Sequence, residues 1–230
     1  MAFRTFATMQ LQEISTLIAR DFKLEMRQKH SIGGVVLYVM ATIFVAYLSF
    51  RQIVDPNTWN ALFWIIVLFA AFNATAKSFW HDRPGLAIYW YTMAAPQSVI
   101  LAKMVYNTLL MNVLGLLSLL FFVLFMGPAA LEDCHWPSLF TAIVLGCTGL
   151  GSALTMIAAV ASKTNNAFGI MAILGMPVIL PLLLSIIRLS QHAMVGIALS
   201  DSWKNALFTG MITVISVTLA YVLFPYLWRD

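Results

Sequence analysis

The sequence predicts an all-α membrane protein: a six-helix transmembrane bundle that follows an amphipathic helix at the membrane surface. Two observations lead to this prediction. Apolar residues make up 61% of the 230 residues and charged residues only 10%, and a soluble domain could not cover so much apolar surface. The apolar residues also gather in six uncharged runs, each long enough to cross a hydrocarbon core of about 30 Å. The composition therefore excludes a cytosolic enzyme, a nucleic-acid-binding domain and a disordered protein.

Residues 1–31 are expected to form a cytoplasmic helix in the membrane interface. Charged residues interrupt this segment, whereas a signal peptide needs an unbroken apolar stretch after a short basic start. Apolar residues recur at helical spacing, at Leu11, Ile14, Ile18 and Phe22, and basic residues lie on another face, at Arg20, Lys23 and Arg27. Such a helix lies in the interface with its basic face toward anionic headgroups.

Six transmembrane spans follow. They are expected at about 32–50, 59–76, 104–126, 138–161, 168–187 and 205–227. None of these ranges contains Lys, Arg, Asp or Glu. Only helices satisfy every backbone group across the bilayer without closing a barrel, and the alternating pattern of barrel strands is absent. We therefore interpret residues 1–230 as a single transmembrane domain.

The basic residues predict the orientation of the chain. Ten of the 13 fall on the side of the N-terminus: Arg4, Arg20, Lys23, Arg27, Lys29, Lys77, Arg83, Lys103, Lys163 and Arg229. Cytoplasmic segments carry an excess of Lys and Arg, so both termini are expected in the cytoplasm. The net charge of +4 thus records orientation, and no nucleic-acid partner is expected.

No catalytic or nucleotide-binding motif is present. The sequence contains no GxxxxGK[ST], HExxH or GxSxG, and no span carries a charge that could relay protons or bind a coupling cation. We expect no enzyme activity, no metal site and no resident cofactor, so any driving energy enters from another chain. Cys134 and Cys147 are not expected to pair, because only one of them lies inside a span.

Four histidines lie outside the spans, at His30, His81, His135 and His192. One interpretation makes each a haem or metal ligand or a proton carrier. The other makes each an interfacial polar residue, and the absence of an i, i+4 partner and of an acidic second shell favours it.

The segment from Lys77 to Lys103 is too long for a turn and too polar to span the membrane. Pro84 and Gly85 mark a turn, and a short helix is expected from Leu86 to Met93. A permease offers such a helix to a partner ATPase, and residues 84–95 are expected to bind one. The alternative is an interfacial aromatic loop with no partner. The candidate coupling residues are Asp82, Arg83, Gly85, Leu86, Tyr89, Trp90, Pro96 and Lys103.

The fourth and fifth spans hold the candidate packing and gating residues. The stretch from Gly146 to Gly169 is rich in small residues, which let helix backbones approach closely in lipid, and Gly149 and Gly151 are expected to pack against neighbouring helices. Pro177 and Pro181 lie one turn apart in the fifth span, where each removes a backbone donor. The bend that they predict is either a gating element or a fixed feature.

Three stretches of the chain resemble the CcmB family, the membrane permeases of the haem exporter in bacterial cytochrome c maturation. They are IARDFKLEMRQKHSIGGVVLY before and into the first span, AAPQSVILAK with Pro96 and Lys103, and LGMPVILPLLL after the turn at Lys163. The chain departs from the family in one place: a glutamate commonly follows the glycine-leucine step in the family, and Gly85-Leu86-Ala87-Ile88-Tyr89 has none. This departure favours a coupling contact made by aromatic packing rather than by charge.

The resemblance implies an ABC-2-type exporter permease in a bacterial inner membrane. A separate CcmA-like ATPase would dock on its inner face, and ATP hydrolysis would drive haem export or release of a haem-loaded chaperone. Further implied partners are a CcmC-like haem-handling protein, a small accessory protein and a periplasmic haem chaperone, with the permease as a homodimer or pseudo-dimer. Haem would be a handled ligand, and ATP would act only through the partner.

Two alternatives share every feature described so far. One is an ABC-2-type exporter permease for another cargo, such as a lipid, a drug or a polysaccharide. The other is a scaffold that assembles haem-handling partners without transport. A stand-alone secondary carrier or membrane enzyme would need an intramembrane charge or a catalytic set, and the spans contain neither.

Overall fold

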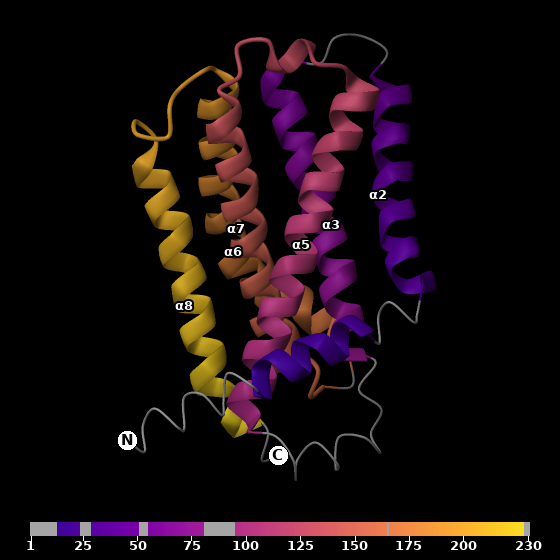
Figure 1. The fold of residues 1–230 in the computed structure, drawn as a ribbon, viewed down its shortest axis with the longest axis vertical. Helices are drawn as coiled ribbons and strands as arrows, with labels where there is room; N and C mark the ends of the chain where they lie inside the picture. The colour runs from indigo at the N-terminus through magenta and orange to yellow at the C-terminus, as the bar shows by residue number, and fades with distance from the viewer. Residues whose placement is uncertain (1–12, 24–28, 51–54, 81–94, 165, 228–230) are drawn as a thin grey trace.

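A computed structural model describes residues 13–23, 29–50, 55–80, 95–164 and 166–227, and every regular element in these ranges is helical (Figure 1). Residues 13–23 form the first helix. It is followed by α2 (Lys29–Ser49), α3 (Pro56–Trp80), α5 (Pro96–Met126), the short 3₁₀ turn η1 (Ala129–Leu131), α6 (Trp136–Ala161), α7 (Ala167–Met194) and α8 (Trp203–Leu227). The all-helical prediction is confirmed for the described residues.

Five helices are long and apolar enough to cross a membrane: α3, α5, α6, α7 and α8. They coincide with the last five expected spans, but all five run further at one or both ends. Lys77, Lys103, Arg188 and Lys204 therefore lie inside helices, close to their ends. With 31 residues, α5 is about 46 Å long, so it extends beyond a hydrocarbon core of about 30 Å.

The first expected span, 32–50, coincides with α2. This helix has 21 residues, and its fully described part, Gly33–Ser49, is an apolar helix shorter than the five long spans. It packs against α3 and α5 and runs alongside them (Figure 1). The structure thus shows five spans plus this shorter apolar helix, and the count of six stays a prediction.

The centre of the bundle is α6. Its most apolar stretch is 78% buried, compared with 22% for that of α8, and it contacts α3, α5, α7 and α8. The abundance of Gly, Ala and Ser in α6 explains this position, because small side chains allow several helices to approach one axis. Many apolar side chains of α8, among them Leu207, Met211 and Val214, are exposed and point away from the protein.

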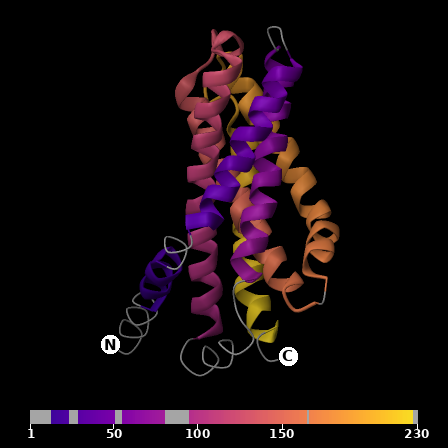
Figure 2. The same cartoon turned by 90° about the vertical axis from the view of Figure 1, so that its right-hand side faces the viewer.

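The helix over residues 13–23 lies across the end of the bundle where α5 begins (Figure 1) and projects from one side of it (Figure 2). Leu17 is buried, Ile14 and Ile18 are half-buried, and Phe22 is exposed. Part of the predicted apolar face therefore packs on the protein itself. The position of this helix in a membrane interface stays a prediction.

The opposite end of the bundle carries the links before α3, α6 and α8. Asp55 precedes α3 and accepts a hydrogen bond from the Thr58 backbone N–H at 3.2 Å. Hydrogen bonds from Thr58, first from its hydroxyl and then from its backbone, lower the pKa of Asp55. Gly127 and Gly196 have φ of 79° and 83°, a conformation that glycine adopts without strain, and both mark the ends of helices.

Candidate functional site

The two helices that flank residues 81–94 meet at one end of the bundle. There, α3 ends at Trp80 and α5 begins at Pro96, close to the helix over residues 13–23 (Figure 1). Of the eight candidate coupling residues, Pro96 and Lys103 lie in the described part of the chain. The other six, and the short helix expected from Leu86 to Met93, lie outside it.

Lys103 joins the start of α5 to the end of α3. Its side chain is buried, with 8% exposed. Its Nζ donates a hydrogen bond to the Ser78 carbonyl at 3.0 Å and lies 4.5 Å from the centre of the Phe79 ring. The last carbonyls of a helix have no partner within it and form the negative end of the helix dipole, so a cation is favourable there. The aromatic ring adds a cation–π contact.

Glu13 caps the start of α5, which has no capping side chain of its own. Ala95, the N-cap residue, makes no side-chain capping bond, and Pro96 follows it without a backbone donor. The Glu13 Oε1 accepts a hydrogen bond from the Ala95 N–H at 3.3 Å, and its Oε2 accepts one from the Ser98 hydroxyl at 2.9 Å. A carboxylate is favourable at this positive end of a helix. The contact ties the helix over residues 13–23 to α5.

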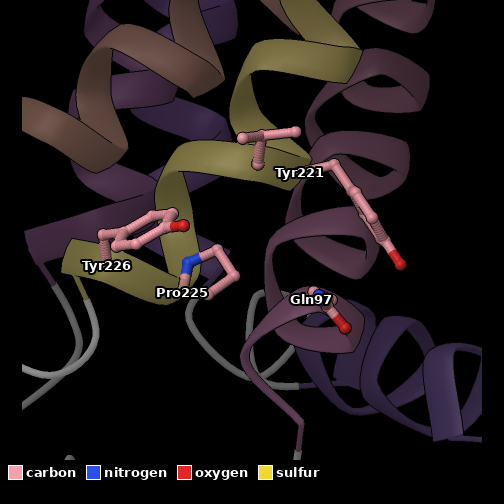
Figure 3. Close-up of a pocket in the computed structure, with 5 residues that line it drawn as sticks. Gln97, Tyr221, Pro225 and Tyr226 are labelled. Carbon is pink, nitrogen blue, oxygen red and sulfur yellow. The ribbon is translucent and has the colours of Figure 1, made fainter.

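A cavity of about 350 Å³ lies beside these contacts, between the start of α5 and the end of α8 (Figure 3). Gln97 lines it from α5, and Tyr221, Val222, Pro225 and Tyr226 line it from α8. Most of the lining is apolar, with the two tyrosine hydroxyls and one amide as its polar groups. Such rings, with one apolar and one polar end, are typical of the level of lipid headgroups.

Gly149 and Gly151 lie on two faces of α6. A Cβ at Gly149 would lie 3.0 Å from a Leu182 methyl and 3.2 Å from the Thr213 hydroxyl, so this glycine faces α7 and α8. A Cβ at Gly151 would lie 3.0 Å from the Thr108 Cα. The backbones of α5 and α6 are therefore in close contact there, as small residues permit.

Further contacts continue along the α5–α6 interface. The Asn107 amide donates to the Thr155 hydroxyl at 3.0 Å, and the Asn112 amide donates to the Thr148 hydroxyl at 3.1 Å. Between membrane helices such hydrogen bonds contribute about 0.6 kcal/mol each on average. At the same interface, Gly115 of α5 leaves room for the Cys147 side chain of α6.

Pro177 and Pro181 both lie inside α7, which continues as a helix through them. Pro177 is exposed and Pro181 is half-buried, so neither is enclosed by neighbouring helices. Gly175, one turn before Ile179, faces Phe72 of α3 and Ile157 of α6. The described structure places the prolines on the outer side of α7, and their role in gating stays a prediction.

A buried polar chain joins α3 to α7. The Trp64 indole N–H donates to the Ser190 hydroxyl at 2.8 Å, and this hydroxyl donates to the Asn60 carbonyl oxygen at 2.7 Å. The Asn60 amide in turn donates to the Ile187 carbonyl at 2.9 Å. The Trp64 ring fills the space beside Gly146, where a Cβ would lie 2.5 Å from it. These buried groups satisfy one another, as buried polar groups must.

Both described histidine side chains make local contacts at the end of the bundle opposite Pro96. His135 is the N-cap of α6 and its Nδ1 accepts from the Ser138 N–H at 3.4 Å. The His192 Nδ1 lies 2.7 Å from the Ser202 hydroxyl. The His30 side chain and the whole of His81 lie outside the described residues. Among the described residues, no three His, Cys, Asp or Glu come together to hold a metal.

The two cysteines differ in their surroundings, and both are free thiols. Cys147 is buried in the centre of the bundle, whereas Cys134 is half-buried in the link before α6. Burial raises the pKa of the Cys134 thiol, which lowers the fraction of reactive thiolate at neutral pH.

Sequence reasoning missed Glu13 and Gly115. The sequence Ala95-Pro96 starts a helix without any Ser, Thr, Asp or Asn at its N-cap, a sign that the cap comes from elsewhere in the chain. Gly115 is the one glycine of the run over 104–126, and an isolated glycine inside a helix usually has a packing reason. Neither signal says which residue is the partner.

Comparison with known proteins supplies the family. Neither the curated proteins nor the solved structures contain a match to this chain. The family described as CcmB protein matches residues 12–226, from the helix at the start of the described structure to the last turn of α8. Since this match covers nearly the whole of a chain with five long apolar helices, the chain belongs to the CcmB family.

Proposed function

We propose that this chain is the permease of an ABC-type complex that couples ATP hydrolysis by a separate ATPase subunit to haem export or release of a haem-loaded chaperone. As a member of the CcmB family, the chain is a multi-pass membrane component of the haem exporter of cytochrome c maturation. The match over residues 12–226 carries this proposal. Its further partners would be a CcmC-like protein, an accessory protein and a periplasmic chaperone, with the permease as a homodimer or pseudo-dimer in the complex.

We place the chain in a bacterial inner membrane with six spans, both termini in the cytoplasm and α2 as the first span. With 21 residues, α2 is about 32 Å long, close to the thickness of the hydrocarbon core. It begins at the same end of the bundle at which α8 ends (Figure 1), as an even number of spans requires. The tyrosines beside the cavity at that end suit the headgroup level.

The charges of the described residues support this orientation. Basic residues near the Pro96 end are Arg20, Lys23, Lys77, Lys103 and Lys163, whereas the opposite end has Arg188 and Lys204. The opposite end also carries four of the described acidic residues, Asp55, Glu132, Asp133 and Asp201. By the positive-inside rule, the Pro96 end faces the cytoplasm, which is where an ATPase would bind.

The geometry around residues 81–94 suits a contact that transmits force. Lys103 joins α3 to α5 on the two sides of this segment, and both helices continue across the bundle. A displacement of the segment would therefore move two spans together rather than bend one helix end. Residues 84–95 are the proposed ATPase-binding stretch.

Haem enters this proposal as cargo rather than as a resident group. Axial haem ligation needs His, Cys, Met or Tyr side chains directed at one iron. The described histidines cap α6 and contact Ser202 instead.

Cysteine crosslinking in the assembled complex tests the proposal. In a chain with both native cysteines replaced, Leu86→Cys is expected to crosslink to the ATPase, and Ala129→Cys, in η1 at the opposite end, is not. Cells that lack the chain should also lack mature c-type cytochromes, and an ATPase without a working nucleotide site should not restore them. Failure of Leu86→Cys to crosslink in a complex that co-purifies would overturn the docking site. Normal c-type cytochromes without the chain would overturn the function.

A further inference from the structure

We propose that the cavity between the start of α5 and the end of α8 binds a glycerophospholipid of the adjacent membrane leaflet. The phosphate of this lipid lies among the polar groups of Gln97, Tyr221 and Tyr226, and an acyl chain lies along the outer face of α8. The inference goes beyond the proposed function and does not depend on it, because it concerns only described residues and the lipid around them.

The first step of the argument is the depth of the cavity. Gln97 is the second residue of α5 and Tyr226 is the last residue but one of α8, at the same end of the bundle (Figure 1). With 31 residues, an α5 centred in the membrane extends about 8 Å beyond each edge of a hydrocarbon core of about 30 Å. Gln97 and Tyr226 therefore lie at the level of the headgroups, and Val222, one helical turn before Tyr226, lies at the edge of the core.

The second step is the chemistry of the lining. Its polar groups are the Gln97 amide and the Tyr221 and Tyr226 hydroxyls, and no hydrogen bond joins them to another residue in the described part of the chain. Figure 3 shows the two tyrosines on opposite sides of Pro225, with Gln97 on the neighbouring helix. Amide and hydroxyl groups donate hydrogen bonds to phosphate oxygens. Among the described residues no charged side chain lines the cavity, so these donors fit the phosphate that all glycerophospholipids share.

The third step is the apolar surface that continues from the cavity. An exposed stripe runs along one face of α8, with each member between 43% and 70% exposed: Tyr226, Val222, Leu219, Ile215, Met211 and Phe208. Steps of three and four residues place these side chains on one helix face. The stripe is about 27 Å long, close to the thickness of the hydrocarbon core of about 30 Å. An acyl chain that starts at the cavity can therefore lie on it as far as the middle of the membrane.

The fourth step is the direction from which the cavity is open. Beside it, Ile100 and Met104 of α5 pack with Ala220 and Phe224 of α8 in a buried cluster that joins the two helices. The tyrosine and valine side chains of the lining are exposed instead. An occupant therefore enters sideways from the membrane rather than from the interior of the bundle.

The pattern of polar and apolar groups favours a lipid over other occupants. The volume of about 350 Å³ is within the range of ligand pockets, about 300–1,000 Å³. A haem carries two propionates, which pair best with Arg or Lys, and the described lining has neither. A helix from a partner satisfies its own backbone groups and would leave the amide and the hydroxyls without acceptors. A phospholipid brings acceptors for the donors at one end and a chain for the stripe beyond them.

Native mass spectrometry of the purified full-length chain measures this binding directly. The chain is freed of lipid in detergent and titrated with dioleoyl phosphatidylethanolamine or dioleoyl phosphatidylglycerol. A single lipid should bind, with similar affinity for both headgroups, because the donors contact the shared phosphate. Glycerol phosphate, which has no acyl chain, should not compete at the same concentration. If it competes, the cavity is an anion site only and the proposal is overturned.

Substitutions on α8 locate the bound lipid. Tyr226→Phe removes one hydroxyl and should weaken lipid binding about fivefold, the factor for one net hydrogen bond. Val222→Trp places a large ring in the cavity and should weaken it about tenfold or more. Val214→Trp is the matched control, because Val214 is also exposed on α8, at 65%, but does not line the cavity. Equal lipid affinities in Val222→Trp and Val214→Trp would overturn the proposal.

Melting temperatures and haem titration complete the test. Added phospholipid should raise the melting temperature of the unchanged chain and of Val214→Trp, since a ligand that binds only the folded state stabilises it, and should have less effect on Val222→Trp. A haem absorbance change that only Val222→Trp abolishes would assign the cavity to haem and overturn the lipid site. Val222→Trp that keeps its lipid but no longer co-purifies with a partner protein would overturn it in favour of a protein interface. The result for Tyr226→Phe, which keeps the ring, decides the site if Val222→Trp fails to fold.

Discussion

The contact between Gly115 of α5 and Cys147 of α6 allows a quantitative test of how this bundle packs. A Cβ built on Gly115 would lie 2.3 Å from the Cys147 Sγ, a distance that two such atoms cannot adopt. Both residues are buried. Gly115→Ala must therefore displace the sulfur or separate the two helices.

The expected size of the effect follows from the neighbouring atoms. Overpacking of this kind costs roughly 1–3 kcal/mol, and the higher helix propensity of alanine offsets about 0.5–1 kcal/mol of it. Cys147→Ala alone removes one buried heavy atom and should cost about 1 kcal/mol. In the double variant the overlapping sulfur is absent. The nearest remaining atoms are the Ile143 Cγ2 at 3.5 Å and the Cβ of residue 147 at 3.7 Å, which are ordinary contact distances.

The double variant should therefore be at least as stable as Gly115→Ala, although it carries one more core substitution. The coupling between the two changes is expected to be about 1–3 kcal/mol in the stabilising direction. The assay is equilibrium unfolding of the four proteins in mixed micelles, with the free energy of unfolding taken from each curve.

Simple additivity, to within about 0.3–0.5 kcal/mol, would refute the reasoning, because distant and independent sites behave in that way. Gly33→Ala combined with Cys147→Ala is the control cycle. A Cβ at Gly33 meets no atom within 4 Å, so this pair should be additive.

Three other predictions follow from the described contacts. Gly151→Ala should destabilise the protein by roughly 1–3 kcal/mol, because its Cβ would lie 3.0 Å from the backbone of α5. The control is Gly210→Ala, whose Cβ would meet no atom within 4 Å and which should not destabilise the protein. Equal melting temperatures for the two variants would contradict the contact at Gly151. Cys134 should react with a membrane-impermeant maleimide from the periplasmic side, while buried Cys147 stays unlabelled. Because burial raises the pKa of Cys134, its labelling rate should still increase between pH 8 and pH 9, and a rate that levels off below pH 9 would contradict the raised pKa. Ser190→Ala should cost roughly 1–3 kcal/mol in unfolding experiments, because it leaves a buried indole N–H without its acceptor; a neutral effect would show that this hydrogen bond does not contribute.

The fold could be predicted from the sequence where run length and charge decide it. Apolar runs without charges must be helical in a membrane, and α3 and α5–α8 coincide with the expected spans. The helix ends were harder to predict, because a helix continues until its backbone is interrupted rather than until its apolar run stops. Lys103 and Arg188 therefore lie inside helices, although both lie outside the expected spans.

The candidate site could be predicted only in part. Pro96, one of the candidate coupling residues, begins α5, since proline is favoured in the first turn of a helix. Lys103 is a candidate because of its place in an expected loop, but the structure places it inside α5, bonded to Ser78. The six coupling residues from Asp82 to Trp90 stay predictions. Glu13 is not among the candidates, because nothing in the sequence around it shows that α5 begins beside it.

The sequence by itself determined that this chain is a helical membrane protein, and it indicated the family that the comparison then confirmed. These properties depend on composition, run length and local motifs, which any stretch of chain carries on its own. The tertiary structure alone decided that α6 is the centre, that Gly115 receives Cys147 and that Glu13 caps α5. Each of these contacts joins residues far apart in the chain. It depends on which helix faces match in shape and charge, and no single segment contains that information.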